Sequence, residues 1–163
     1  MVACGRGHCL STLRPMEAII LCGIQATGKS TFCRERFYAT HMRLNLDMLK
    51  TRHREQILLN AFIQAKQPFV VDNTNPTRED RRRYIDAARA AGFRTVGYYF
   101  ESKISDALVR NAARQPAEFV SEPGIKGTSA RLELPSASEG FDALFHVRIG
   151  DAGFEVREWR DEV

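Results

Sequence analysis

Two glycines, Gly23 and Gly28, are separated by four residues and followed directly by Lys29 and Ser30. This spacing is typical of a phosphate-binding loop, whose backbone N–H groups point inward at phosphate oxygens. Lys29 has the charge and reach for the β- and γ-phosphates of a nucleoside triphosphate, and the Ser30 hydroxyl can bind Mg²⁺. The residues expected to contact the nucleotide are Gly23, Gln25, Ala26, Thr27, Gly28, Lys29, Ser30 and Thr31.

The segments on either side of the loop fit this interpretation. Residues 18–22 form a continuous apolar run, which is typical of a buried parallel strand, expected over Glu17–Cys22. The segment Lys29–Tyr38 is expected to be a helix, because Cys33 and Phe37 are four residues apart and share one face. A strand before and a helix after distinguish a phosphate loop from a glycine-rich turn without a ligand, since the helix presents its positive end to the anion.

An acidic residue, Asp72, ends a second apolar strand predicted over Phe69–Asp72. In a parallel sheet this position lies at the carboxyl edge, beside the phosphate loop. There Asp72 can orient Mg²⁺ directly or through water. The run Asn73–Pro76 that follows also suits an Asx turn into the next helix, and both roles can hold together.

Asp47 ends a short strand predicted over Met42–Leu46, so it is also expected on the ligand side of the sheet. A carboxylate there could take a proton from a substrate hydroxyl that attacks the γ-phosphorus. It could equally be the N-cap of a helix predicted from Met48 to Ala65, which has Leu58, Phe62 and Ala65 on its buried stripe. The residues alone do not decide between these roles.

Arg110 and Arg114 lie four apart on one face of a helix predicted over Ile104–Arg114. A planar guanidinium is suited to bridging phosphates as charge develops, although an exposed basic face is the commoner use of such a pair. The segment Gln115–Thr128 is predicted to be a mobile lid, because turn-forming residues interrupt it. These are Pro116, Pro123, Gly124 and Gly127.

The chain has 163 residues, enough for one domain, with 44% hydrophobic and 27% charged residues and a net charge of +4. No apolar run approaches membrane-span length and no secretory signal is present, so we expect a cytoplasmic protein. Cys22 and Cys33 are interpreted as buried thiols. Cys4, His8 and Cys9 lack a second ligand pair at zinc-finger spacing, so reduced thiols are the better interpretation.

Residues 1–15 show no periodicity and are predicted to be a disordered, dispensable tail, with Met16 as a candidate translation start. Residues 16–163 alternate strands and helices, which predicts an α/β fold: the three-layer P-loop NTPase sandwich, with a mostly parallel sheet and helices on both faces. The later predicted elements are a helix opening at Pro76 with Tyr84, Ala88 and Ala91 buried, a strand Arg94–Phe100, a short helix Arg131–Leu134, and strands Phe145–Ile149 and Phe154–Trp159.

From Met16 to about Ile149 the chain resembles the kinase domain of 5′-hydroxyl polynucleotide kinases and related small bacterial P-loop kinases of AAA type. The shared motifs are Gly-x-x-x-x-Gly-Lys-Ser-Thr-Phe at 23–32, Asn-x-Asp at 45–47, Val-Asp-Asn-Thr-Asn-Pro at 71–76, the helix end at 89–92, Arg-Asn-x-x-Arg at 110–114, and Glu-Gly-Phe at 139–141. The resemblance implies ATP and Mg²⁺ as cofactors. It also implies roles for individual residues: Asp47 as general base, Lys29 and Ser30 as phosphate and magnesium contacts, Asp72 behind the metal, and Arg110 and Arg114 as lid arginines.

Two positions depart from the family pattern. Leu46 replaces the arginine usual before the base, and Lys50 replaces an arginine that holds the acceptor's phosphate. The sequence therefore predicts a phosphotransferase that moves the γ-phosphate of MgATP to a hydroxyl. The acceptor is either the 5′ end of DNA or RNA or a small molecule. A non-catalytic ATP-binding module would not need Asp47 or Arg114, and a motor ATPase would need a partner element. Oligomeric state is not predicted.

Overall fold

The computed structural model describes residues 16–160. The predicted tail over residues 1–15, including Cys4, His8 and Cys9, lies outside the described residues. Cys22 and Cys33 are buried free thiols, as predicted, and burial raises the pKa of each to about 11. Within the described part, no helix is long and apolar enough to cross a membrane.

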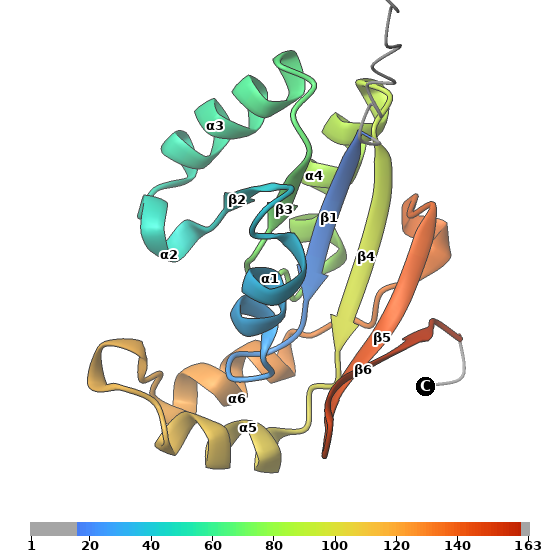
Figure 1. Ribbon diagram of the computed structural model, residues 1–163. Coiled ribbons are helices and arrows are strands. Elements are labelled where there is room, and N and C mark those ends of the chain that lie inside the picture. Colours follow the sequence, from blue (N-terminus) through green and yellow to red (C-terminus); the bar gives the residue numbers. More distant parts are fainter. Residues whose placement is uncertain (1–15, 161–163) are drawn as a thin grey trace, which may run out of the picture.

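The centre of the fold is a six-stranded sheet in the order β2-β3-β1-β4-β5-β6 (Figure 1). Its first five strands run parallel, and β6 pairs antiparallel with β5. Apolar runs with buried residues on both sides explain the parallel arrangement, since helices must cover both faces. The strands are β1 Glu17–Cys22, β2 Met42–Leu44, β3 Phe69–Val71, β4 Arg94–Phe100, β5 Ala143–Gly150 and β6 Gly153–Glu158.

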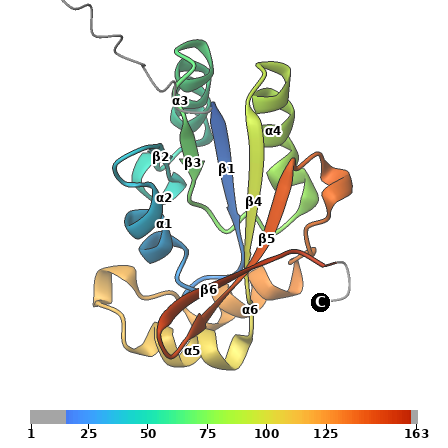
Figure 2. The same cartoon turned by 45° about the vertical axis from the view of Figure 1, so that its right-hand side comes forward.

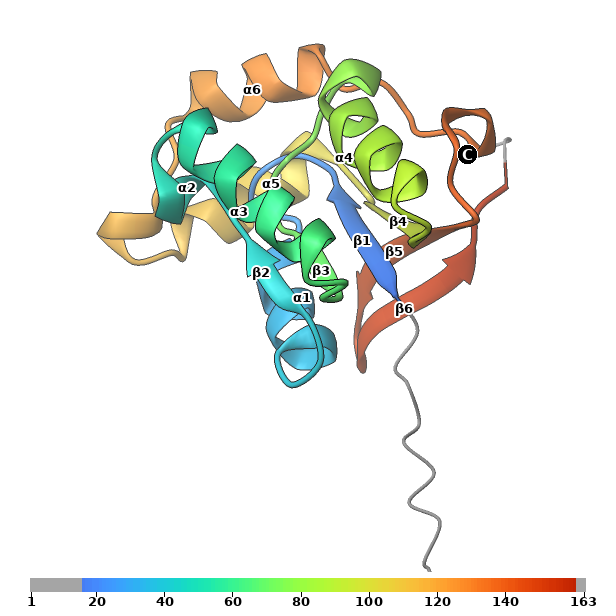
Figure 3. The same cartoon turned by 90° about the horizontal axis from the view of Figure 1, so that it is seen from above.

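Helices cover both faces, which confirms the predicted three-layer α/β sandwich (Figure 3). On one face, α1 (Lys29–Phe37) packs Phe32 and Phe37 against the sheet. On the other, α3 (Arg52–Gln64) and α4 (Arg78–Ala90) form a second core. Two further helices, α5 (Ile104–Ala112) and α6 (Glu122–Ala130), lie at the end of the sheet toward which the strand arrows point (Figure 2).

The helix predicted over residues 48–65 is in fact two helices. A short α2 (Leu46–Leu49) ends at Lys50, whose φ of 68° is left-handed, and Thr51 then caps α3. The predicted stripe is also partly wrong. Phe62 is buried, but Leu59 and the carboxylate of Glu55 complete the inner face, while Leu58 is half-buried and Ala65 exposed. The stripe is rotated because a polar network draws Glu55 inward, where it accepts hydrogen bonds from Tyr84 and Asn73.

The segment after α5 also differs from the prediction. The helix expected over Arg131–Leu134 is absent, and α6 occupies residues within the predicted lid instead. Ser121 caps α6 and Pro123 stands in its first turn, where a missing N–H costs nothing. Ile125 is fully buried and anchors the helix. Two short 3₁₀ turns, η1 Pro116–Glu118 and η2 Ala137–Glu139, flank this region.

Candidate active site

The phosphate loop joins β1 to α1 in the conformation that its glycines allow. Gly23 and Gly28 have φ values of +141° and +91°, which L side chains rarely adopt. A Cβ on Gly23 would lie 2.9 Å from the Phe100 carbonyl oxygen, and one on Gly28 would lie 2.8 Å from the Phe154 ring. The close packing of β4 and β6 against the loop therefore excludes a larger residue at either position.

Lys29 is held inside this loop with only 7% of the residue exposed. Its ammonium donates to the carbonyl oxygens of Gly23, at 2.9 Å, and Ile24, and to the Thr27 hydroxyl at 3.2 Å. Burial lowers the pKa of Lys29 to about 8, and Asp72 is the strongest of the charges that oppose the shift. The predicted partner Ser30 follows on the first turn of α1, with its side chain exposed.

Asp72 lies directly after β3 and is 2% exposed. Its Oδ2 accepts two hydrogen bonds from Arg43, from Nε at 2.8 Å and from Nη2 at 2.6 Å. The permanently charged Arg43 guanidinium is thus paired with this buried carboxylate. Sequence reasoning missed Arg43. No sequence pattern pointed to this pair, because Arg43 meets Asp72 through the parallel pairing of β2 with β3, which is set by the strand order of the sheet.

The N-cap interpretation of Asp47 is wrong, because Asn45 fills that place. Asn45 Oδ1 accepts from the Met48 N–H at 3.0 Å, while its Nδ2 donates to the Asp72 carbonyl oxygen at 2.5 Å. Asp47 lies in the first turn of α2 and is exposed. Its charge raises the pKa of Lys29, more weakly than the charge of Asp72 does.

The Asn-Thr-Asn run after Asp72 ties the phosphate loop to α2. Asn73 Oδ1 accepts from the Leu46 N–H at 2.8 Å. Asn75 donates from Nδ2 to the Leu21 carbonyl oxygen at 2.7 Å, and the Thr74 carbonyl accepts from the Gly23 N–H at 2.9 Å. These bonds form one hydrogen-bond network that connects the end of β1, the run after β3 and the helix that carries Asp47.

The two predicted lid arginines have different partners. Arg110 donates from Nε to the Ala26 carbonyl oxygen of the phosphate loop at 2.7 Å. Arg114 donates from Nη1 to the Glu118 carbonyl oxygen at 3.1 Å, and its charge lowers the pKa of Lys29. Both side chains are half-buried. The charges of Asp47, Asp72 and Arg114 thus all influence the pKa of Lys29, while Arg110 contacts the loop backbone.

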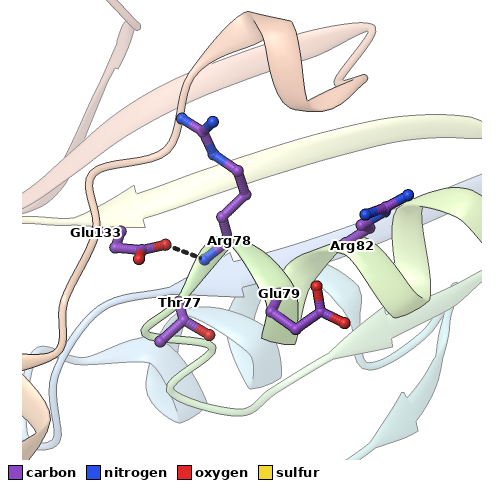
Figure 4. Close-up of a pocket in the computed structure, with 5 residues that line it drawn as sticks. All are labelled: Thr77, Arg78, Glu79, Arg82 and Glu133. Carbon is purple, nitrogen blue, oxygen red and sulfur yellow. Dashed lines mark hydrogen bonds between the residues drawn. The ribbon is translucent and has the colours of Figure 1, made fainter.

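A cavity of about 430 Å³ opens at the start of α4, where none of the predicted site residues lies. Figure 4 shows Arg78 and Arg82 projecting from α4, with Glu133 accepting a hydrogen bond of 2.6 Å from the Arg78 N–H. Between these two arginines in the sequence, the fully buried Arg81 makes a bidentate pair with Glu139 and donates to the Glu133 carbonyl oxygen. This pair anchors the chain after α6 to α4, a role that the sequence did not reveal.

Comparison with known proteins fits this geometry. The sequence pattern of the AAA domain family matches residues 45–135, more than half of the chain. The chain belongs to the AAA domain family. The matched range includes Asp47, Asp72, Arg110 and Arg114, and the phosphate loop precedes it.

A curated relative of this AAA domain chain is the bifunctional polynucleotide phosphatase/kinase of Schizosaccharomyces pombe, 29% identical over 138 residues. The match covers 80% of this chain but 33% of that protein, so the chain spans about a third of the relative's length. Among solved structures, a gluconokinase from Sinorhizobium meliloti 1021 superposes with a TM-score of 0.59 at 16% identity, covering 85% of this chain and 86% of that one. Kti12 from Chaetomium thermophilum gives 0.60 at 17% identity, covering 83% and 92%. These likenesses show a P-loop kinase-like fold.

The two departures from the polynucleotide kinase pattern lie on α2. Leu46 uses its backbone N–H to bind Asn73, so the side chain is not needed for that contact. Lys50 is the exposed C-cap of α2, and its N–H donates to the Leu46 carbonyl oxygen at 2.7 Å. The cation at position 50 is therefore close in sequence and structure to Asp47, but it offers a point charge in place of a planar fork.

Proposed function

We propose that this AAA domain protein is an ATP-dependent phosphotransferase that moves the γ-phosphate of MgATP to a hydroxyl group. The observation that carries the proposal is that Asp47 is exposed and does not cap its helix. Its helix is capped by Asn45, so Asp47 has no structural duty at the helix start, and its exposed carboxylate still acts on the pKa of the buried Lys29. A module that only binds nucleotide has no need of such a carboxylate.

Nucleotide binding is assigned to the loop and the first turn of α1. Backbone N–H groups of residues 25–31 and the Lys29 ammonium would hold the phosphates, since the Gly23 N–H already donates to the Thr74 carbonyl oxygen. Ser30 and Asp72 supply the hydroxyl and carboxylate oxygens that Mg²⁺ prefers, so these residues fit the metal, with Arg43 already on Asp72 Oδ2. When bound, Mg²⁺ neutralises charge on the β- and γ-phosphates.

In the transfer step, Asp47 accepts the proton of the acceptor hydroxyl as its oxygen attacks the γ-phosphorus. The bond from the γ-phosphorus to the β,γ-bridging oxygen breaks, and ADP leaves with the electron pair. Arg114 turns from Glu118 to stabilise the charge on the transferring group. Arg110, which holds the Ala26 carbonyl, supports the loop from the same helix.

A polynucleotide 5′-hydroxyl is the acceptor that we propose. The resemblance to the polynucleotide phosphatase/kinase supports it, and so do the exposed basic residues around the end of α2 and the start of α3. These residues are Lys50, Arg52, His53 and Arg54. Contacts from such residues to backbone phosphates would make activity fall as salt rises. A small-molecule hydroxyl is the competing acceptor of the same fold.

The test offers the protein ATP labelled on the γ-phosphate, with DNA and RNA oligonucleotides and a panel of small hydroxylated metabolites. The proposal expects label on 5′-hydroxyl oligonucleotides, none on 5′-phosphorylated controls, and less label as salt rises. Label on a metabolite alone would replace the polynucleotide with a small-molecule acceptor. Tight nucleotide binding with no labelled acceptor would favour the binding module.

A further inference from the structure

Asn111, the buried asparagine between the two lid arginines, makes a paired contact across the chain. It is 2% exposed at the end of α5. Its Nδ2 donates to the Val120 carbonyl oxygen at 2.7 Å, and its Oδ1 accepts from the Val120 N–H at 3.1 Å. One side-chain amide therefore satisfies both backbone groups of a residue nine positions later, as a neighbouring strand would.

This contact closes the base of a loop over residues 112–119. The segment between the two partners is exposed along almost all its length, including Phe119 at 57%, and Arg114 is the half-buried exception. Inside the loop, Arg114 reaches across to the Glu118 carbonyl oxygen. The loop thus has few contacts with the body of the protein, and Asn111 fixes where it begins and ends.

The elements on both sides of the loop are firmly packed. Ala107 of α5 and Ile125 of α6 are fully buried in a small core with Ile24 and Ala26 of the phosphate loop. Gln25 adds a hydrogen bond of 2.9 Å from Nε2 to the hydroxyl of Thr128 in α6. Because α6 is held on the phosphate loop, residues 115–119 are the part of the predicted lid that lies outside this packing.

We infer that Asn111 is a positioning residue: by closing the loop at Val120 it sets the place from which Arg114 reaches the transferring phosphate. The inference rests on the proposed function, because it assumes that Arg114 acts in transfer. It assigns Asn111 no contact with the nucleotide. Removing the amide would let the base of the loop open, so Arg114 would sample many positions while the phosphate loop stayed intact.

The experiment compares Asn111→Ala with Asn60→Ala, a matched loss of an exposed amide on α3 that only bonds Gln56. We expect turnover of Asn111→Ala to fall roughly tenfold, as loss of a buried hydrogen-bonding group that places a catalytic cation would predict. Affinity for an unhydrolysable ATP analogue should stay within about twofold, since the loop backbone and Lys29 carry binding. Cleavage by a glutamate-specific protease after Glu118 should become faster in Asn111→Ala alone.

A double-mutant cycle separates positioning from general damage. If Asn111 acts through Arg114, the double variant with Arg114→Ala should be no slower than Arg114→Ala alone. Additive losses, or unchanged turnover and cleavage in Asn111→Ala, would overturn the inference. Asn111→Asp keeps the acceptor for the Val120 N–H but removes the donor to the Val120 carbonyl oxygen. It replaces Asn111→Ala in the same comparison if the alanine variant does not fold. If the unchanged protein transfers no phosphate, the proposed function fails, and the cleavage comparison still decides whether Asn111 holds the loop.

Discussion

Asp47 and Arg114 both act on the pKa of Lys29, one raising it and the other lowering it, but the structure holds them by different means. The helix that carries Asp47 is bound at its first turn by Asn45 and Asn73, and these amides connect it to the strand ends beneath. Arg114 stands in an exposed loop with a contact to Glu118 inside the same loop. The helix that carries Asp47 is thus fixed to the strand ends, whereas the loop that carries Arg114 is tied at its base by the bonds between Asn111 and Val120.

This contrast has a physical reason in the proposed chemistry. A general base must stay within hydrogen-bond reach of the attacking hydroxyl, which favours a site on packed and hydrogen-bonded elements. A cation that covers the γ-phosphate must let nucleotide in and ADP out, which favours a loop that opens and closes.

The largest effect is expected from Lys29→Ala. The proposed roles of Asp47 and Arg114 both require a bound triphosphate, and Lys29 is the residue proposed to bind its β- and γ-phosphates. Transfer should fall by roughly 10³-fold or more, and affinity for an unhydrolysable ATP analogue should weaken. Isothermal titration and a turnover assay measure these two quantities. Lys126→Ala, which removes an exposed lysine paired with Glu122 on α6, is the control. Equal affinity and turnover in both variants would contradict the assignment of the loop.

Asp47→Asn tests the proposed role of Asp47 as general base. Transfer should drop by roughly 10²-fold or more, since an amide cannot take up the acceptor's proton. The melting temperature and nucleotide affinity should stay the same, because Asn45 and not Asp47 caps α2. Asp86→Asn, on the exposed face of α4, is the matched control. Turnover near that of the unchanged protein would remove Asp47 from the chemistry.

Asn73→Ala asks whether the hydrogen bonds under α2 matter for transfer or only for stability. The change leaves the Leu46 N–H and Glu55 without this partner, which should cost about 1–3 kcal/mol in urea unfolding. If the fixed placement of Asp47 is needed, kcat should also fall roughly tenfold with nucleotide affinity unchanged. A loss of stability with normal kcat would mean that these hydrogen bonds serve stability and not transfer.

The smallest effect concerns pH. With a pKa of about 8, Lys29 is partly neutral above pH 8 in the protein without nucleotide, although the same group in the unfolded chain has a pKa of 10.5. The unfolded state then binds more protons, so this group makes stability rise with pH between about 8 and 10.5. Triphosphate favours the charged ammonium, so binding should take up protons and weaken above pH 8. Titration calorimetry in buffers of different ionisation enthalpy measures the uptake, and no uptake at pH 8–9 would contradict the buried Lys29.

The sequence predicted the parts of this molecule that depend on local pattern. Apolar runs predicted β1, β3 and β4, and the Gly-Lys-Ser spacing predicted the loop between β1 and α1. The break at Lys50 was not predictable from periodicity, because a left-handed residue between two capped helices leaves the apolar spacing nearly intact. The helix α6 was missed because its proline and two glycines suggested a loop, whereas the burial of Ile125 favours a packed helix.

The candidate site was predicted by residue type but not by partner. Two of the contacts that set it join residues far apart in the chain, since Arg43 binds Asp72 and Asn73 binds the backbone of α2, and a third joins Asn111 to Val120 nine positions later. Single-sequence patterns report which residues could do chemistry. They do not report which neutral amides hold the elements that carry them, since those bonds depend on how the strands are ordered in the sheet.

Transfer of the γ-phosphate to a 5′-hydroxyl can be followed directly with labelled ATP. Protein, Mg²⁺, γ-labelled ATP and a 5′-hydroxyl oligonucleotide are mixed, and the label is traced to the oligonucleotide or to inorganic phosphate. We expect label on the 5′ end of the oligonucleotide with the unchanged protein, and loss of this label with Lys29→Ala and with Asp47→Asn. Label appearing only as inorganic phosphate, at a rate that Asp47→Asn does not change, would contradict it.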